Sequence, residues 1–255
     1  MRLNTIAACL LLSSAFVCAA HAETGVKHPK AIAWEFEGIF GKVDKASAQR
    51  GLQVFREVCS ACHGVHRVAM RSLTELGFSE AEVKKLASEY TVKDGPDADG
   101  EMYERPGLPS DHFPSPYPNE QAARAANGGA YPPDLSLITK ARHDGANYLH
   151  ALLTGYEDAP ADFVLPEGKY YNPYFPGGAI AMPQPIGSAG QVQYSDKTEA
   201  SIDQMARDVT SFLQWAAEPE MEARKKMGIK VMIFLSILTV LLYFAKKRIW
   251  SRLKK

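Results

Sequence analysis

The chain has 255 residues, 46% of them hydrophobic, and its 29 basic and 29 acidic residues give a formal net charge of zero. The charges are segregated, because eleven basic residues lie before position 23 or after position 223, whereas every acidic residue lies within 23–223. Residues 23–223 therefore hold 18 basic and 29 acidic residues, a net charge of minus eleven. Such a field attracts basic protein partners in a salt-sensitive way, although solubility explains any single acidic cluster equally well. No nucleic-acid partner is expected.

The N-terminus has the pattern of a secretory signal peptide. Arg2 precedes an apolar stretch over 6–20, and Ala-His-Ala at 20–22 is typical of a cleavage site. We predict that residues 1–22 are cleaved and that the mature chain begins near Glu23. A retained N-terminal helix is less favoured because the apolar stretch is short. A mitochondrial transit peptide would be amphipathic and richer in Arg, so the pattern favours a bacterial exported protein.

The sequence Cys59-Ser60-Ala61-Cys62-His63 has the C-x-x-C-H spacing that attaches a c-type haem. The two thiols can form thioether bonds with one porphyrin edge, and the adjacent imidazole then faces the iron. The alternatives are a redox dithiol, which usually follows a strand and needs no His, half of a zinc site, which needs about four ligands, and chance. Residues 48–58 predict a helix, and the remaining cysteines lie within the first 22 residues. We therefore predict one covalently attached haem c and no disulfide.

Periodicity and capping signals predict a mainly helical chain. Ser79 and Glu82 form a capping-box pattern at the start of a helix that extends to about Tyr90. The other helical candidates are 120–126, 146–154 and 198–217. The last of these can continue past Pro219 into the segment that follows.

Long irregular segments separate the predicted helices. Residues 105–119 and 156–190 are rich in Pro, Gly and aromatic side chains and are too long for ordinary connections. Loops of that kind can wrap a large flat cofactor. The densest acidic cluster, over 89–104, is also predicted to be a loop because it contains Gly and Pro.

An iron held by His63 still lacks a sixth ligand. Met182 is the favoured candidate because it lies in an irregular Gly- and Pro-containing segment, 177–185, that can fold back over the haem. Met70 is too close to His63 in sequence, and Met205 has the helical spacing of a core residue. The other candidates are Met102, Met221, His112, His143 and His150. A His/Met pair raises the reduction potential, which suits an acceptor late in an electron-transfer chain.

The C-terminal region predicts a membrane span. Residues Met227 to Ala245 are apolar except for Lys230 and the hydroxyl side chains, and the run has about the 20 residues that a bilayer-spanning helix needs. Because it is apolar on every face, a span is favoured over a buried core helix. The basic residues that follow mark the cytoplasmic side. We predict that 23–223 form an exported haem domain and that 224–255 form a lipid-embedded anchor with a short basic cytoplasmic tail.

Seven segments together resemble one family. They are 59–63 (CSACH), 127–136 (NGGAYPPDLS), 141–143 (ARH), 152–156 (LLTGY), 171–177 (YNPYFPG), 181–183 (AMP) and 215–220 (WAAEPE). In this order they are similar to the bacterial type of the cytochrome c1 family, the membrane-anchored haem subunit of the cytochrome bc1 complex. The resemblance covers essentially all of the mature chain. It implies a mainly α fold: a class I c-type cytochrome-like haem domain with long loops, plus one C-terminal transmembrane helix.

The resemblance also implies roles for individual residues. Cys59 and Cys62 would form the thioether bonds, and His63 and Met182 would be the axial ligands. Arg142 would approach a haem propionate. The weaker pocket candidates are Tyr148, Asn127 and Pro133, for which turn formation and packing are the alternative. Some bacterial members carry an extra cysteine pair, and its absence here leaves open what stiffens the Met182 loop.

The function that the resemblance implies is electron transfer rather than substrate chemistry. The chain would receive one electron from a Rieske iron-sulfur protein, which draws it from ubiquinol oxidised at cytochrome b, and would donate it to a basic cytochrome c. It would not be an enzyme on its own, and the complex is expected to be dimeric, in a bacterial inner membrane with the haem domain in the periplasm. The alternatives are a membrane-anchored monohaem cytochrome c that serves a terminal oxidase, a haem-based sensor, and a haem enzyme such as a peroxidase.

Overall fold

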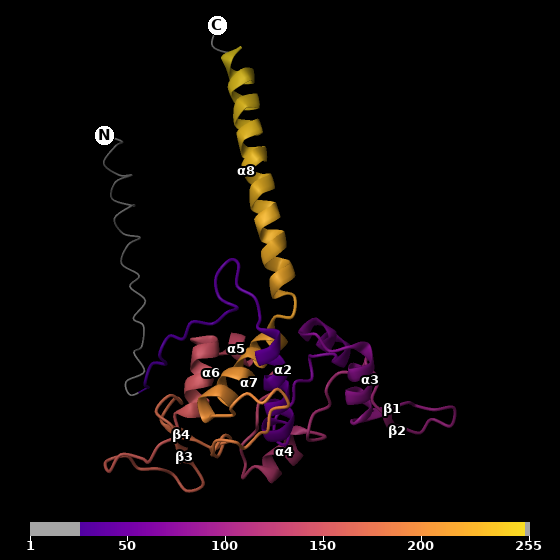
Figure 1. Cartoon of the computed structure of the whole chain (residues 1–255), viewed down its shortest axis with the longest axis vertical. Coiled ribbons are helices and arrows are strands. Elements are labelled where there is room, and N and C mark those ends of the chain that lie inside the picture. The colour runs from indigo at the N-terminus through magenta and orange to yellow at the C-terminus, as the bar shows by residue number, and fades with distance from the viewer. Residues whose placement is uncertain (1–25, 253–255) are drawn as a thin grey trace, which may run out of the picture.

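The computed structural model describes residues 26–252, which form a helical body from which one long helix extends (Figure 1). The predicted signal peptide, 1–22, lies outside the described residues. The elements are α2 (Lys45–Val54), a π-helix η1 (Phe55–Cys59), a 3-10 helix η2 (Met70–Leu76), α3 (Glu80–Ser88), β1 (Thr91–Asp94), β2 (Tyr103–Pro106), α4 (Glu120–Ala126), α5 (Ile138–Ala141), α6 (Gly145–Thr154), β3 (Tyr170–Tyr171), β4 (Ala179–Ile180), α7 (Ile202–Ala217) and α8 (Met221–Ser251). The prediction of a mainly α fold with one C-terminal apolar helix is confirmed.

Helices α2 and α7 pack against each other at the centre of the body. A Cβ atom on Gly51 of α2 would lie 2.0 Å from the carbonyl oxygen of Asp208 on α7, so only glycine permits this approach. The rings of Phe55 and Phe212 meet across the same contact, with centroids 5.7 Å apart. Met205 is fully buried in this core, as its helical spacing predicted.

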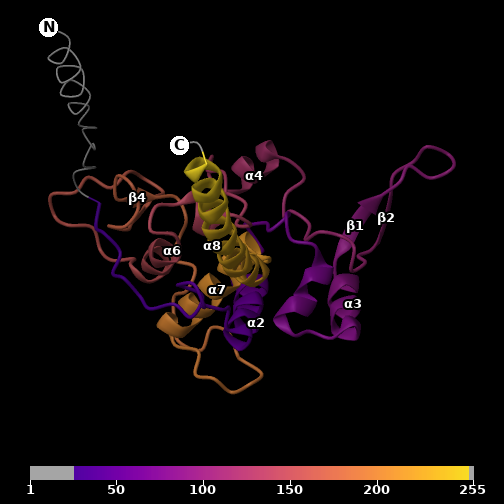
Figure 2. The same cartoon turned by 90° about the horizontal axis from the view of Figure 1, so that it is seen from above.

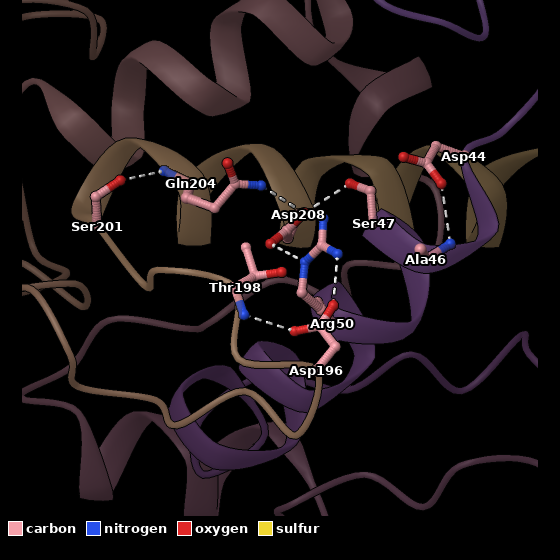
Figure 3. A network of polar contacts seen from close by, with 9 residues as sticks. All are labelled: Asp44, Ala46, Ser47, Arg50, Asp196, Thr198, Ser201, Gln204 and Asp208. Atoms are coloured by element: carbon pink, nitrogen blue, oxygen red, sulfur yellow. Dashed lines mark hydrogen bonds and ion pairs between the residues drawn. The ribbon is translucent and has the colours of Figure 1, made fainter.

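A buried polar network joins the same two helices (Figure 3). The fully buried Asp208 carboxylate accepts two hydrogen bonds from Arg50, at 2.9 and 3.0 Å. It also accepts hydrogen bonds from Ser47 at 2.7 Å and from Gln204 at 3.0 Å. Arg50 makes a second ion pair with the more exposed Asp196 at 2.9 Å. The hydrogen bond to Asp208 raises the pKa of Arg50, so the buried carboxylate always faces a cation.

Side-chain caps place the helix starts close to where the sequence predicted them. The Ser79 hydroxyl accepts from the Glu82 amide at 3.3 Å, and Glu82 accepts in return from the Ser79 amide at 2.8 Å, which is the capping box of α3. The predicted helices over 120–126 and 146–154 are found as α4 and α6. The helix predicted over 198–217 starts four residues later, at Ile202, because Ser201 caps it.

The helix over 198–217 does not continue past Pro219. α7 ends at Ala217, and Glu218 leaves the helical region with φ −146° and ψ 65°. Proline restricts the residue before it to extended conformations, which disfavours a helix that runs straight through. A new helix, α8, starts at Met221. The break lets α8 leave the body in its own direction (Figure 1).

Most of the acidic segment over 89–104, predicted as a loop, belongs to the antiparallel hairpin β1–β2, which spans residues 91–106. The hairpin extends away from the body (Figure 2). Arg105 of β2 pairs with Asp94 of β1 and with Asp111, the latter at 2.6 Å. These contacts offset part of the repulsion among the acidic side chains, which is why a Gly- and Pro-containing sequence is ordered here. The other predicted loops are largely irregular: 105–119 contains only the end of β2, and 156–190 contains only the two-residue strands β3 and β4.

The last helix, α8, is long enough and apolar enough to cross a membrane. It has 31 residues, a mean hydropathy of 2.2 over its most apolar window, and no part of that window is buried against the body. An apolar helical segment that none of the described residues covers requires an apolar solvent. α8 therefore fits a single transmembrane helix.

Candidate functional site

The C-x-x-C-H residues form the turn that ends η1. The amides of Cys62 and His63 donate to the Cys59 carbonyl oxygen at 3.1 and 2.9 Å, and the Ser60 amide donates to the Phe55 carbonyl oxygen at 2.8 Å. Both cysteines are half-buried free thiols, and Cys59 packs against the main core. The turn follows a helix, as predicted, and not a strand, which disfavours the redox-dithiol interpretation.

The imidazole of His63 is oriented by one backbone carbonyl. Its Nδ1 lies 2.7 Å from the carbonyl oxygen of Pro133. Because a carbonyl oxygen only accepts, Nδ1 carries the proton and Nε2 has the free lone pair, which is the form that binds a metal. Burial lowers the pKa of His63 and outweighs the opposing effect of the carbonyl. The ring is therefore held neutral, with one nitrogen available as a ligand.

The segment that contains Pro133 is fixed directly against the C-x-x-C-H turn. The Leu135 amide donates to the Gly64 carbonyl oxygen at 2.8 Å. The Asp134 carboxylate accepts from the amides of His66 and Ser136, both at 2.9 Å. Burial raises the pKa of Asp134, but the hydrogen bonds from Ser136 and His66 together outweigh it and lower the pKa. Two segments 70 residues apart in sequence thus form one rigid unit.

Met182 is half-buried and lies two residues after β4. Its carbonyl oxygen accepts a hydrogen bond from the Tyr156 hydroxyl at 3.0 Å. The fully buried Asn172 connects the loop to the end of α6, because its side-chain amide donates to the Leu152 carbonyl oxygen at 2.8 Å. Its backbone amide donates to the Gly178 carbonyl oxygen at 2.9 Å. Hydrogen bonds to α6 and the β3–β4 pair therefore stiffen this loop where a disulfide is absent.

The chain after Met182 is anchored on its other side. Ile186 is 1% exposed and belongs to the main core. The Gln191 side chain donates to the Pro185 carbonyl oxygen at 2.9 Å and accepts from the Gly187 amide at 3.0 Å. The Met182 segment is thus held at both ends, with its own side chain half-exposed.

The remaining candidate residues lie in different environments. Arg142 is exposed, just before α6, and Tyr148 is half-buried on that helix. Burial raises the pKa of Tyr148, and the Arg142 guanidinium opposes this shift. Asn127 donates to the Ala123 carbonyl oxygen at 2.7 Å and to the Tyr117 hydroxyl at 3.1 Å. These two hydrogen bonds stabilise the turn after α4.

The other candidates for the sixth iron ligand lie in different environments from Met182. Met70, Met205 and Met221 are buried among apolar side chains. The Nε2 atom of His150 contacts an oxygen of Asp203 at 2.9 Å. The candidate ligands Met102, His112 and His143 are exposed to solvent. Over residues 26–252, no group of three or more His, Cys, Asp and Glu side chains is arranged to hold a metal ion.

Comparison with known proteins identifies the family, because residues 34–253 match the sequence model of the Cytochrome C1 family. The chain belongs to the cytochrome c1 family. It is 53% identical over 245 residues to "Cytochrome c1-2, heme protein, mitochondrial" of Solanum tuberosum, covering 96% of this chain and 94% of the relative. It is 50% identical over 237 residues to cytochrome c1 of Rhodospirillum rubrum, covering 87% of each.

A third member of the cytochrome c1 family is longer. The chain is 50% identical over 254 residues to "Cytochrome b/c1" of Bradyrhizobium diazoefficiens, and the match covers 91% of this chain but only 37% of that protein. The resemblance inferred from the seven sequence segments is therefore confirmed.

Two of those segments contain residues to which the sequence assigned no role, Tyr156 and Asn172. The sequence signal for Tyr156 and Asn172 was their position within these segments. Their roles could not be predicted further, because a hydrogen bond to a backbone carbonyl leaves no sequence pattern.

Proposed function

We propose that this chain is the haem-bearing electron-transfer subunit of a cytochrome bc1 complex. Cys59 and Cys62 would form thioether bonds to one haem c, and His63 and Met182 would be its axial ligands. Membership of the cytochrome c1 family supports this proposal. The structural observation that carries it is the 2.7 Å contact between His63 Nδ1 and the Pro133 carbonyl oxygen, which leaves Nε2 available to iron.

The surroundings of the turn fit a haem. The two free thiols lie on one turn beside a large apolar core, where a flat apolar ring system can be shielded from water. Arg142, three residues before α6, and Tyr148, on that helix, could bind the propionates. The bound haem would supply a one-electron carrier. The protein would fix its position, exclude water and set its potential through the ligands and burial.

The partners follow from the same proposal. The chain would accept an electron from a Rieske iron-sulfur protein and donate it to a basic cytochrome c, in a complex with cytochrome b that is expected to be dimeric. Relatives named "Cytochrome b/c1" and "Cytochrome b-c1 complex catalytic subunit, mitochondrial" support this assembly. The chain makes and breaks no substrate bond and would therefore not be an enzyme on its own.

The membrane arrangement completes the proposal. Residues 1–22 would be a cleaved signal peptide, 23–223 a periplasmic haem domain, and 224–255 an anchor with a cytoplasmic tail in a bacterial inner membrane. The exposed apolar α8 and the basic residues that follow its apolar run support this orientation.

The test is a reduced-minus-oxidised absorption spectrum of the tagged chain, purified from native membranes in mild detergent. We expect c-type and b-type haem bands that a quinol reduces. Bands of c-type haem alone, or together with oxidase haems, would instead indicate a separate carrier.

A haem stain of the denatured chain tests covalent attachment separately. The stain should remain on the wild-type chain and on the control Ala61→Ser, which changes an exposed residue of the same turn. It should be lost in Cys59→Ser combined with Cys62→Ser. A stain retained by the double variant would contradict the thioether assignment.

A further inference from the structure

The loop over residues 34–41 presents two large apolar side chains to the outside. Trp34 and Phe36 are each 6% exposed, and their rings stack at 5.3 Å. Ile39 and Phe40, at the tip, are 68% and 81% exposed. The loop therefore buries one apolar pair in the body and exposes the other.

The exposure of the tip is built into an ordered turn. The Lys42 amide donates to the Glu35 carbonyl oxygen at 2.9 Å across the base of the loop. Gly38 has a positive φ of 72°, which glycine adopts without strain. A Cβ atom on Gly41 would lie 1.9 Å from the Glu37 carbonyl oxygen, so the turn needs glycine there too. The tip is held outward by this geometry.

The loop is attached to the first turns of α8. The Lys225 ammonium of α8 donates to the carbonyl oxygens of Phe36 at 2.7 Å and Gly41 at 3.0 Å. Met221, at the start of α8, is 3% exposed and packs in the same cluster as the buried pair of the loop. The apolar run of α8 begins at Met227, only two residues after Lys225. The loop thus lies at the end of the body from which α8 leaves (Figure 1).

Single exposed apolar side chains are common on soluble surfaces and need no explanation. Ile39 and Phe40 differ because they lie together at the tip of an ordered loop. That loop is hydrogen-bonded to α8 two residues before the apolar run begins. The tip therefore lies at the level of the bilayer surface. Aromatic and aliphatic side chains at such a depth are stabilised by burial among acyl chains. The exposed charges in and next to the loop are Glu35, Glu37 and Lys42. They carry both signs, so apolar burial and not charge would provide the attraction.

We propose that Ile39 and Phe40 insert into the lipid leaflet through which α8 enters the membrane. A single helix leaves the body free to rotate and tilt about its axis. A second contact, displaced from that axis and rigidly joined to Lys225, removes this freedom. The Ile39–Phe40 tip then fixes how the body is oriented over the membrane surface.

Depth measurement of a label at the tip tests this proposal. The full-length Phe40→Cys chain, purified alone, is labelled with a nitroxide and placed in nanodiscs of phosphatidylcholine and phosphatidylglycerol. We expect the nitroxide to be relaxed by dissolved oxygen and protected from a water-soluble nickel complex. The matched control is Val164→Cys, an apolar residue that is 90% exposed in the segment between α6 and β3. That segment lies on the side of the body away from α8 (Figure 1). Its label should be readily reached by nickel.

A label at position 40 that nickel reaches as readily as at position 164 would overturn the proposal. Protection that appears only in the intact complex, and not in nanodiscs of the isolated chain, would also overturn it, because a neighbouring subunit would then cover the tip. Wild-type protein carried through the same labelling measures any background from Cys59 and Cys62, so the result does not depend on haem attachment. If Phe40→Cys alters the fold, Ile39→Cys gives the same comparison.

Discussion

His63 illustrates how a neighbour decides the chemistry of one side chain. An isolated histidine can carry its proton on either nitrogen and titrates near neutral pH. Here the Pro133 carbonyl oxygen at 2.7 Å selects the Nδ1–H form, and burial lowers the pKa. The sequence located His63 next to the cysteines, and it ranked Pro133 only as a weak pocket candidate. The sequence could not identify Pro133 as the hydrogen-bond partner of His63, because the acceptor is a backbone oxygen and every residue type has one.

The thioether of Met182 is expected to be an axial ligand of the haem iron. Met182→Leu should leave the haem attached, because the thioether bonds would be to Cys59 and Cys62, but should lower the reduction potential, since a thioether ligand favours the reduced iron. A redox titration of the purified chain measures the change. Met102→Leu, at a site 61% exposed, should leave the potential unchanged. A wild-type potential in Met182→Leu would eliminate this ligand.

The Tyr156 hydroxyl holds the backbone at Met182. Tyr156→Phe removes the 3.0 Å hydrogen bond to the Met182 carbonyl oxygen, at a cost of about 1 kcal/mol. For a domain of this size, that loss lowers the thermal midpoint by roughly 2–4 °C. The temperature at which the methionine ligand dissociates, followed by absorption, should fall by a similar amount. Tyr170→Phe is the control because Tyr170 is 45% exposed, and an equal effect of both variants would contradict the assignment.

At the scale of the elements, the contact between α2 and α7 organises the body. Gly51 permits the close approach of the two helices, and the network around Asp208 fixes their register. A buried carboxylate is costly unless it is paired and fully hydrogen-bonded. Only the correct docking of α7 on α2 satisfies it, so the network selects one arrangement.

Loss of the cation in this network should be strongly destabilising. Arg50→Ala leaves the fully buried Asp208 without its ion partner, which costs about 3–5 kcal/mol. Asp196→Ala removes the exposed partner of the same arginine and should cost less than about 1 kcal/mol. Chemical denaturation of the two variants in the same detergent measures the difference. Similar losses of unfolding free energy in Arg50→Ala and Asp196→Ala would show that burial does not determine the strength of these ion pairs.

The hairpin gives a prediction for acid stability. Hydrogen bonding with Arg105 lowers the pKa of Asp111 from an ordinary 3.8 to about 2. Since the folded pKa is the lower one, this pair stabilises the fold above pH 4, and its contribution is lost as the pH falls from about 4 to about 2. Asp111→Asn should therefore be less stable than wild type at neutral pH, and the gap should close towards pH 2. Unfolding curves across this range measure it, and a gap that persists at the lowest pH would argue against the ion pair.

For the whole molecule, the separation of the acidic body from the apolar, basic-flanked α8 determines where each part can reside. The body has its own core, whereas the apolar window of α8 has no buried residue against it. A stop codon at Gly228 removes almost all of the apolar run and should release a folded haem domain into the soluble fraction. The two side chains of the Ile39–Phe40 tip are too small an anchor to hold it. Haem staining of membrane and soluble fractions measures the release, and a truncated chain that stays in the membranes would point to another anchor.

The sequence by itself was enough for features that depend on local spacing. The C-x-x-C-H motif, the capping box at Ser79, the helical stripe containing Met205 and the apolar run from Met227 each have a physical cause within a few turns of chain. The family could be inferred as well, because short segments kept their order along the whole chain. A uniform apolar run or a cap needs no distant partner, and so it can be read from the residues alone.

Only the tertiary structure decided which distant groups meet. The carbonyl of Pro133 on His63, the hydroxyl of Tyr156 on the Met182 backbone, and the ammonium of Lys225 on the loop of Ile39 and Phe40 join segments that are tens of residues or more apart. Each of these contacts involves a backbone oxygen, so the identity of the accepting residue carries no signal. The hairpin within 89–104 was missed for a similar reason, since its order depends on Arg105 bridging Asp94 and Asp111, and the local composition favours a loop. Backbone acceptors are present at every position, and only the packing of the fold selects the one that is used.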